Sequence, residues 1–381
     1  MRIFFVTNNY IPYSGGVVSS IVATSDALRS QGHEVFIITL DFLKDQQSDD
    51  PHYVIRLYCP IKFTYKKNYM AIPWRPTSSI IQLIKKYTPD IIHVHHPFFL
   101  GTSALKAARI CNIPCVFTYH TLYEHYAHYV PLIPKHYTKQ LIRSLVNRFC
   151  NKVDGIITPS REIKEYLINQ HISCPIHIIP SPLRSLFCTT TITTRPVATD
   201  HMFKLLVVSR FVPEKNIPFI FDIFKTLPDY FILTLIGYGN DYEAMQFLAF
   251  NILHLPKNRV IFIHKPAQND LLNYYRNADL FIFSSTTDTQ GIVLAESMSQ
   301  AVPVIAIDGP GQRDIIINGI NGFIINNTQE AATIIIQISQ DKLLHNHLRQ
   351  GALKTAGHYN SNYISQKLIN FYHYIINSIN C

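Results

Sequence analysis

Three clusters of polar side chains interrupt a chain in which 47% of the residues are hydrophobic. They contain His120, Arg210 with Lys215, and Asp288 with Glu296. Each cluster follows a short apolar segment typical of a buried strand, and open parallel sheets bind their ligands at that end of the strands. Two cations, two carboxylates and an imidazole suit a ligand with a diphosphate at one end and hydroxyl groups at the other. A nucleotide sugar fits this description.

Arg210 and Lys215 lie within the segment Ser209–Asn216, which we expect to be a loop between a strand and a helix. Arg and Lys side chains usually lie on the surface without a specific role, and the alternative interpretation is that Arg210 and Lys215 do the same. Two fixed cations can also stabilise the charge that develops on a diphosphate leaving group without a metal ion. The chain has no Asp-x-Asp sequence, the usual holder of a nucleotide-bound divalent ion. We therefore predict a site that needs no metal and no other cofactor.

The segment Ser284–Glu296 is the most specific local pattern. A strand is expected to end just before it, followed by a polar loop with Gln290 and Gly291 and by a helix that carries Glu296. Carboxylates accept hydrogen bonds from paired hydroxyl groups, so Asp288 and Glu296 suit recognition of a sugar and a ribose. In the alternative interpretation, Asp288 caps the helix and Glu296 faces water.

Gly15 and Gly16 are expected between the first strand and the first helix. Glycines at this place let the backbone approach a ligand closely and leave helix N–H groups for an anion. The sequence lacks the Gly-x-Gly-x-x-Gly pattern of dinucleotide sites. An ordinary tight turn is the alternative.

Histidines gather at two predicted strand ends. His120 begins a loop rich in aromatic and His side chains, and His93, His95 and His96 lie on or just past another strand. A His in a strand is more often a satisfied core residue than a catalyst. Zinc is a further alternative, but no Cys/His set has the spacing of zinc ligands. We predict no metal at these histidines.

A chain of 381 residues, only 15% of them charged, is long enough for two or three domains with buried sheets. Short apolar runs alternate with amphipathic segments, which indicates an α/β fold with doubly wound parallel sheets. The first helix is expected at Val17–Gln31, and an apolar helix at Phe371–Ile379 ends the chain. Strands are expected at Ile3–Val6, Val35–Leu40, Ile91–His95, Cys115–Tyr119, Gly155–Thr158, Ile176–Ile179, Leu205–Ser209, Phe231–Ile236, Val260–His264, Leu280–Phe283, Pro303–Ile307 and Gly322–Ile325.

A Thr-rich stretch with proline, roughly Ser185 to Asp200, lacks periodicity and is expected to be a linker. Two domains joined by one linker leave a cleft between them, where we expect the ligand. The predicted parts are an N-terminal domain at 1–185, the linker at 186–203, a C-terminal domain at 204–357, and a helical segment at 358–381 that could return to the N-terminal domain.

Composition also bears on location. No apolar run reaches the ~20 residues that cross a bilayer. The apolar run after Arg2 is too short for a signal peptide. Seven cysteines without regular spacing favour free thiols in a reducing compartment, so we expect a cytoplasmic protein.

The net charge of +9 is unevenly distributed. Residues 1–199 carry 21 basic and 11 acidic side chains, whereas residues 200–381 carry 13 and 14. A solvated basic face is one interpretation, and an anionic partner is the other. Nucleic acid is disfavoured because zinc-finger spacing, an RNP-like motif and an Arg-rich helix are missing. The segment Pro134–Lys152 combines apolar and basic positions as interfacial helices do, which favours an anionic membrane surface. Its cations are Lys135, Lys139, Arg143, Arg148 and Lys152.

These motifs resemble the GT-B glycosyltransferases of glycosyltransferase family 4 over nearly the whole chain. The shared marks are Gly15-Gly16, the segment Arg210–Asn216, and Asp288 eight residues before Glu296. Within the family, residues 118–126 and 288–291 look most like the 1,2-diacylglycerol glucosyltransferases. One position departs from the pattern: the family has Glu where this chain has Asp288, which is one methylene shorter and reaches less far toward the sugar.

The resemblance implies a retaining enzyme with two Rossmann-like domains that face each other across a cleft. Arg210 and Lys215 would hold the donor diphosphate. Asp288 would meet the sugar hydroxyls, Glu296 the ribose, and His120 the transferred sugar. Family members of this type also dock on anionic membranes through the N-terminal domain. The other donor-binding residues that the resemblance implies are Gly15, Gly16, Gly237, Gly239, Gln290 and Gly291.

We therefore expect transfer of a hexose, glucose from UDP-glucose, onto a lipid hydroxyl such as that of diacylglycerol. One alternative keeps the reaction but uses a lipopolysaccharide, polyprenol or soluble sugar acceptor. A second is a nucleotide-sugar 2-epimerase, against which the spacing of Asp288 and Glu296 speaks. A third is a non-catalytic module that binds nucleotide sugars.

Overall fold

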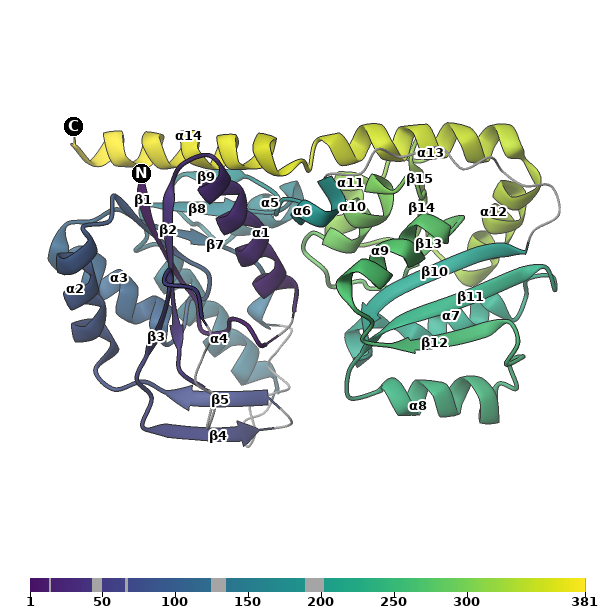
Figure 1. Ribbon diagram of the computed structural model, residues 1–381, viewed down its shortest axis with the longest axis horizontal. Helices are drawn as coiled ribbons and strands as arrows, with labels where there is room; N and C mark the ends of the chain where they lie inside the picture. The colour runs from purple at the N-terminus through teal and green to yellow at the C-terminus, as the bar shows by residue number, and fades with distance from the viewer. Residues whose placement is uncertain (14, 43–49, 66–67, 125–134, 189–201, 381) are drawn as a thin grey trace. The chain divides into compact units, whose positions relative to one another are not determined.

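The computed structural model describes residues 1–13, 15–42, 50–65, 68–124, 135–188 and 202–380 (Figure 1). The chain forms two compact units, each with its own parallel sheet and its own core. Unit 1 comprises Met1–Pro182 together with Ser361–Cys381, and unit 2 comprises Leu183–Asn360. The C-terminal segment thus packs with the first part of the chain. Most of the predicted linker, residues 189–201, lies outside the described residues.

Unit 1 contains a seven-stranded parallel sheet in the order β3-β2-β1-β6-β7-β8-β9. The order reverses between β1 and β6, so the carboxyl ends of these strands form a topological switch point. The strands are β1 (Arg2–Val6), β2 (Glu34–Leu40), β3 (Val54–Leu57), β6 (Ile91–Val94), β7 (Cys115–Thr118), β8 (Gly155–Thr158) and β9 (Ile176–Ile178). The helices are α1 (Gly16–Ser30), α2 (Pro76–Tyr87), α3 (Leu100–Cys111), α4 (Lys135–Cys150), α5 (Arg161–Asn169) and α14 (Ser361–Asn380).

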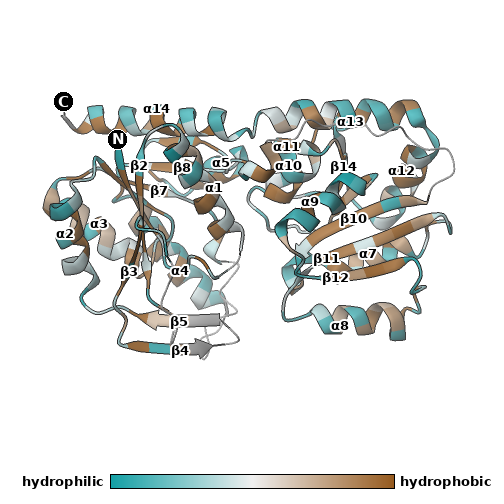
Figure 2. Cartoon of the chain, in the orientation of Figure 1, coloured by the Kyte–Doolittle hydropathy of each residue, from teal (hydrophilic) through white to brown (hydrophobic). Residues whose placement is uncertain are grey.

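Helices cover both faces of this sheet, which explains why its central strands are largely apolar (Figure 2). Side chains of a strand alternate between the two faces. Phe4 and Val6 therefore share a core with α2, α3, α4 and α5, while Ile3 and Phe5 share the opposite core with α1 and α14. Tyr372 of α14 is fully buried in that second core.

Unit 2 contains a six-stranded parallel sheet in the order β12-β11-β10-β13-β14-β15. Its switch point lies between β10 and β13. The strands are β10 (Phe203–Arg210), β11 (Phe231–Tyr238), β12 (Val260–His264), β13 (Leu280–Phe283), β14 (Val304–Ile307) and β15 (Gly322–Ile325). The helical elements are α6 (Ser185–Cys188), the 3₁₀ turn η2 (Pro213–Lys215), α7 (Ile217–Phe224), α8 (Tyr242–Phe247), the π-helical turn η3 (Leu248–Ile252), α9 (Gln268–Asn277), α10 (Ile292–Ser299), α11 (Pro310–Ile315), α12 (Thr328–Gln340) and α13 (Lys342–Gly357).

The two doubly wound sheets confirm the predicted fold class, and each of the twelve predicted strands is present within a residue or two of its expected limits. Three strands were not predicted. One is the edge strand β3, and the others are the antiparallel pair β4 (Ile61–Tyr65) and β5 (Asn68–Ile72). Exposed apolar side chains such as Ile61 and Phe63 show that this pair lies at the surface. Its sequence therefore lacks the uninterrupted apolar run of a central strand.

Candidate active site

In unit 2, Lys215 and Asp288 meet at the switch point of the sheet. Lys215 ends η2, just after β10, and Asp288 lies in the loop after β13. Because β10 and β13 are neighbouring parallel strands, both loops leave the same edge of the sheet. The Lys215 Nζ atom lies 2.6 Å from both carboxylate oxygens of Asp288. The two side chains expected to hold a diphosphate and a sugar are thus partners of each other.

Side-chain hydroxyls fix these two loops together. Ser284 Oγ donates to the carbonyl oxygen of Lys215 at 2.6 Å, and Ser285 Oγ donates to that of Glu214 at 3.2 Å. Gly291, the N-cap residue of α10, lies in the left-handed region with φ 63°, which favours glycine. The backbone N–H of Gly311 donates to the carbonyl oxygen of Asp288 at 3.0 Å. These hydrogen bonds therefore fix the two loops that carry Lys215 and Asp288.

Arg210 is the last residue of β10, and its Nη2 atom lies 4.0 Å from Glu214 Oε1. This is a long ion-pair distance, and the Arg210 side chain is 36% exposed. The Lys215 side chain is only 12% exposed. The two cations predicted for the diphosphate thus lie on the same strand-to-helix connection, one partly exposed and one largely buried.

Glu296 lies on α10 and is buried, with 3% of its surface exposed. Arg184 Nη2 lies 2.8 Å from its Oε1 atom, and Tyr275 donates to its Oε2 atom at 3.2 Å. Burial raises the pKa of Tyr275 well above its ordinary value, and the nearby Glu296 raises it further. The alternative in which Glu296 faces water and Asp288 caps the helix is wrong, because Gly291 is the N-cap residue and no side chain caps it.

Sequence reasoning missed Arg184 and Tyr275. A buried carboxylate requires a partner, which is the one signal that could have prompted a search for a cation. Nothing in the local sequence points to Arg184, which precedes Glu296 by 112 residues. The Arg184 guanidinium balances the negative charge of Glu296, so α10 carries a paired charge in the core.

Close backbone packing accounts for Gly237 and Gly239 at the end of β11. A Cβ atom at Gly237 would lie 1.7 Å from the carbonyl oxygen of Ser209, and one at Gly239 would lie 2.2 Å from that of Phe211. Glycine is thus required at both positions, because any side chain there would clash with the backbone of β10 or of the loop after it. In contrast, a Cβ atom at Gly16 would meet no atom within 4 Å among the described residues beyond its chain neighbours and its own helix. Gln290 is half-buried next to Gly291, and its backbone lies against Gly311.

In unit 1, the ends of β6 and β7 bring four histidines together. His95 Nδ1 lies 2.9 Å from His120 Nε2, and His96 Nδ1 lies 3.2 Å from the Thr7 hydroxyl after β1. The two nitrogens of His93 lie 2.6 Å from the hydroxyls of Tyr372 and Thr118. His93 is therefore the satisfied core residue that the alternative interpretation describes.

Burial keeps these imidazoles neutral at physiological pH. It lowers the pKa of His93 to about 3 and that of His96 to about 4. The pKa values of His95 and His120 fall well below 6.5 for the same reason, with the neighbouring histidines adding to the effect. The lowered pKa makes His120 a weak base, because its imidazole takes up a proton only at acidic pH.

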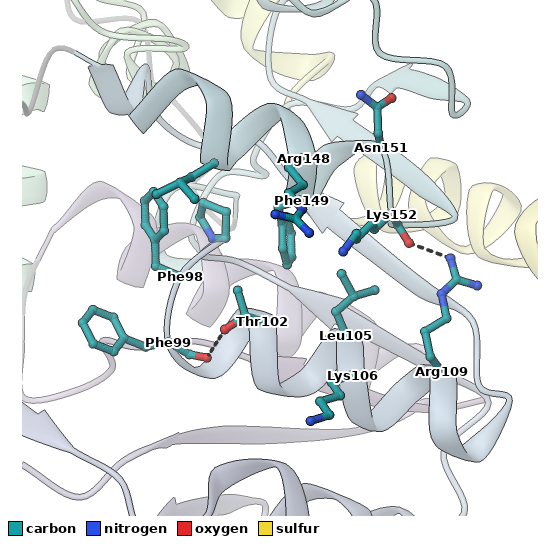
Figure 3. A pocket seen from close by; sticks show the side chains of 12 residues that line it. Phe98, Phe99, Thr102, Leu105, Lys106, Arg109, Arg148, Phe149, Asn151 and Lys152 are labelled. Carbon is teal, nitrogen blue, oxygen red and sulfur yellow. Dashed lines mark hydrogen bonds between the residues drawn. The ribbon is translucent and has the colours of Figure 1, made fainter. Parts of the chain in front are cut away.

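A cavity of about 980 Å³ lies between α3 and α4 in unit 1 (Figure 3). Its apolar wall includes Phe98, Leu105 and Phe149. Basic side chains also line it: Lys106, Arg109, Arg148 and Lys152. Arg109 pairs with Asp154, whereas none of the other three forms an ion pair within the part of the chain that the structure describes.

The other predicted membrane-facing residues lie in different surroundings. Lys139 is exposed on α4, and Arg143 Nε lies 2.7 Å from Glu124 Oε2. The side chain of Lys135 and residues 125–134 lie outside the description. Among residues with a described structure, no group of three His, Cys, Asp or Glu side chains could hold a metal ion, and six cysteines are free. No helix in the described ranges is long and apolar enough to span a bilayer.

Two family models match the chain in succession. Residues 14–183 match the model "Glycosyltransferase Family 4", and residues 194–355 match "Glycosyl transferases group 1". The alpha-monoglucosyldiacylglycerol synthase of Streptococcus pneumoniae is 31% identical over 357 residues, which cover 88% of this chain and 78% of that protein. The chain belongs to glycosyltransferase family 4.

The enzyme of the same name from Acholeplasma laidlawii is 27% identical to this glycosyltransferase, over 90% of this chain and 89% of that protein. Among solved structures, Anabaena HepE in complex with UDP-glucose has a TM-score of 0.75 and 19% identity, and covers 97% of this chain and 99% of that one. The glycosyltransferase therefore has the GT-B fold, with two Rossmann-like domains.

The buried ion pair of the glycosyltransferase gives a stability prediction. Arg184→Ala leaves the Glu296 carboxylate buried without its cation, which should lower the free energy of unfolding by about 3–5 kcal/mol. Arg313→Ala is the control, because the Arg313 and Asp308 side chains are 54% and 38% exposed; surface pairs contribute about 0–1 kcal/mol. Urea denaturation of both variants measures the difference. Equal stability of the two variants would contradict the assigned role of Arg184.

The cations of the unit 2 loop give an activity prediction. Arg210→Ala and Lys215→Ala should each lower turnover by roughly two or more orders of magnitude, the scale of losing a preorganised charge. Lys225→Ala is the matched control, since Lys225 is an exposed cation at the end of α7. Steady-state transfer from a nucleotide sugar measures all three. Near-normal turnover in both loop variants would remove the electrostatic role.

Proposed function

We propose that this glycosyltransferase moves glucose, with retention of configuration, from UDP-glucose to the hydroxyl group of a diacylglycerol-type lipid at an anionic membrane surface. The pairing of Lys215 with Asp288 at the unit 2 switch point is the observation that carries the transfer step. The two similar synthases support the lipid acceptor, and the UDP-glucose complex of HepE supports the donor.

Lys215 can serve both ends of the donor. An ammonium group has three N–H donors, so Lys215 can keep Asp288 in place and still bind a phosphate oxygen. Asp288 then lies beside the phosphate that carries the sugar, and its remaining lone pairs can accept from sugar hydroxyls. Arg210, which is partly exposed, adds a second cation for the diphosphate.

The other donor contacts follow from the same geometry. The Glu296 carboxylate is oriented by Arg184 and Tyr275 but has about four lone-pair sites, so it can also accept from the ribose hydroxyls. Packing against the described residues outside its own helix does not require glycine at position 16, which supports a close approach of the donor to α1. Gly15, Gln290 and Gly291 are the other residues that we propose to contact the donor.

The proposed reaction needs no strong side-chain base. The acceptor oxygen attacks the anomeric carbon on the face of the leaving group as the bond from that carbon to the phosphate oxygen breaks. The acceptor proton passes to the departing phosphate oxygen, and UDP leaves. Arg210 and Lys215 stabilise the developing charge in place of a metal ion. The lowered pKa of His120 agrees with a role in contacting the sugar without removing the proton.

The cavity between α3 and α4 supports a lipid partner. Phe99 lies at the edge of the cavity and is 57% exposed. Its φ is 51°, and non-glycine residues with such positive φ values tend to occur at functional sites. Leu145 on the facing helix is 47% exposed. Arg148 and Lys152 stand beside this apolar surface, as in proteins that lie on anionic membranes (Figure 3). We accordingly propose a cytoplasmic protein that associates peripherally with the inner face of the membrane.

Incubation of the pure protein with a panel of nucleotide sugars and total membrane lipid tests the proposed reaction. We expect a mass increase of one hexose on diacylglycerol with UDP-glucose, and NMR of the product should show the α-anomer that retention produces. Transfer onto lipopolysaccharide, a polyprenol or a soluble sugar would replace the proposed acceptor. Conversion of the nucleotide sugar without any acceptor would indicate an epimerase instead, and binding without turnover a non-catalytic module.

Vesicle sedimentation tests the membrane surface separately. The protein should sediment with vesicles containing phosphatidylglycerol but not with phosphatidylcholine alone. Arg148→Glu combined with Lys152→Glu should weaken this binding at least about tenfold, since each basic side chain contributes about 1 kcal/mol near such a surface. Lys342→Glu with Lys354→Glu makes the same charge change on exposed lysines of α13 and should bind as the native protein does. Equal loss in both variants, or binding independent of lipid charge, would contradict the proposed surface.

A further inference from the structure

The hydrogen bond between His95 and His120 restricts where their protons lie. The His95 Nδ1 and His120 Nε2 atoms are 2.9 Å apart, and the two rings are 23° from parallel. Both rings are neutral, so each carries one N–H group and one lone pair. One ring must donate and the other must accept. The pair therefore has two possible arrangements of protons.

The second nitrogen of His95 distinguishes these arrangements. His95 Nε2 is buried and has no hydrogen-bond partner among the described residues. With its proton on Nε2, His95 would bury an unpaired N–H group, and such groups are rarer in proteins than unpaired acceptors. With its proton on Nδ1, the donor is satisfied by His120 and only a lone pair is left in the core. The second arrangement is favoured.

We propose that His95 is a positioning residue: its Nδ1–H group donates to His120 Nε2 and holds His120 in the tautomer that carries its proton on Nδ1. In this tautomer His120 carries its N–H group on Nδ1, so it contacts an oxygen atom of the transferred sugar as a hydrogen-bond donor. This second step rests on the proposed function. The tautomer itself does not depend on it.

The surroundings hold His95 in the required orientation. Its ring stacks on that of His93, with centroids 4.3 Å apart and planes 27° from parallel. His93 in turn is fixed by Thr118 on β7 and by Tyr372 on α14. Phe5 of β1 packs against His95 with ring centroids 4.8 Å apart. The C-terminal helix is thus the outer support of a chain of contacts that ends at His120.

The tautomer can be measured without an activity assay. In protein labelled with ¹⁵N-histidine, long-range ¹H–¹⁵N correlation spectra distinguish a protonated from an unprotonated ring nitrogen, and the His120→Gln variant identifies the signals of His120. We expect Nδ1 of His120 to be protonated and Nε2 to be unprotonated. A proton on Nε2, or on both nitrogens, at neutral pH would overturn the proposal.

Two substitutions of His95 test its role as a positioning residue. In His95→Asn the amide nitrogen is bonded to Cγ, as Nδ1 is in histidine, so this side chain can still donate a hydrogen bond. The side chain in His95→Leu cannot donate. His120 should keep its tautomer in the Asn variant and show Nε2 protonated in part of the molecules in the Leu variant. Glucosyl transfer should fall about tenfold in the Leu variant, the value of one lost hydrogen bond of about 1.4 kcal/mol, and recover in the Asn variant.

Melting temperatures show whether each variant is folded. If His95→Leu does not fold, the tautomer of His120 in the native protein still tests the proposal. An unchanged His120 tautomer in folded His95→Leu would overturn the proposal. A protein with the expected tautomers but no glucosyl transfer would contradict the proposed function and leave the positioning role of His95 intact.

Discussion

The ion pair of Lys215 and Asp288 exists because two parallel strands end at the same edge of one sheet. Strands β10 and β13 are neighbours although two other strands separate them in the sequence, because the strand order reverses at this point. Their two following loops must therefore meet. The same constraint in unit 1 brings the segment after β1 beside the segment after β6, where Thr7 contacts His96. Both groups of candidate residues depend on this one property of open parallel sheets.

Burial gives the two groups different chemistry. In unit 2 the charges remain but are compensated: Lys215 by Asp288, and Glu296 by Arg184. Removing a charge from water costs several kcal/mol unless a partner stands opposite it, so each of these pairs is a packing requirement as well as a chemical resource. In unit 1 desolvation lowers the pKa values of His95 and His120 well below 6.5, so these imidazoles are neutral at physiological pH. The candidate histidines of unit 1 are thus uncharged, whereas the candidate residues of unit 2 keep their charges.

The residues proposed for the donor and those proposed for the lipid lie on different kinds of element. The residues proposed for the donor lie on loops after strands, whereas the cavity with basic and apolar lining lies between two helices of unit 1. Phe98 connects the two regions: it lines the cavity, and its ring packs on that of Tyr123, three residues past His120. A lipid seated at the cavity would therefore contact the same segments that carry the candidate histidines.

The sequence alone determined the strands, the fold class and the loops that carry His120, Lys215 and Asp288, because a buried strand requires a local apolar run and a site follows its end. It did not determine β3, an edge strand of mostly half-buried residues, or the antiparallel pair β4 and β5, which exposes Ile61 and Phe63 at the surface. The tertiary structure decided which buried polar groups are partners. Arg184 is 112 residues from Glu296, and Tyr372 is 279 residues from His93. No local pattern encodes such distances, since burial demands a partner for each polar group but leaves its position in the chain open.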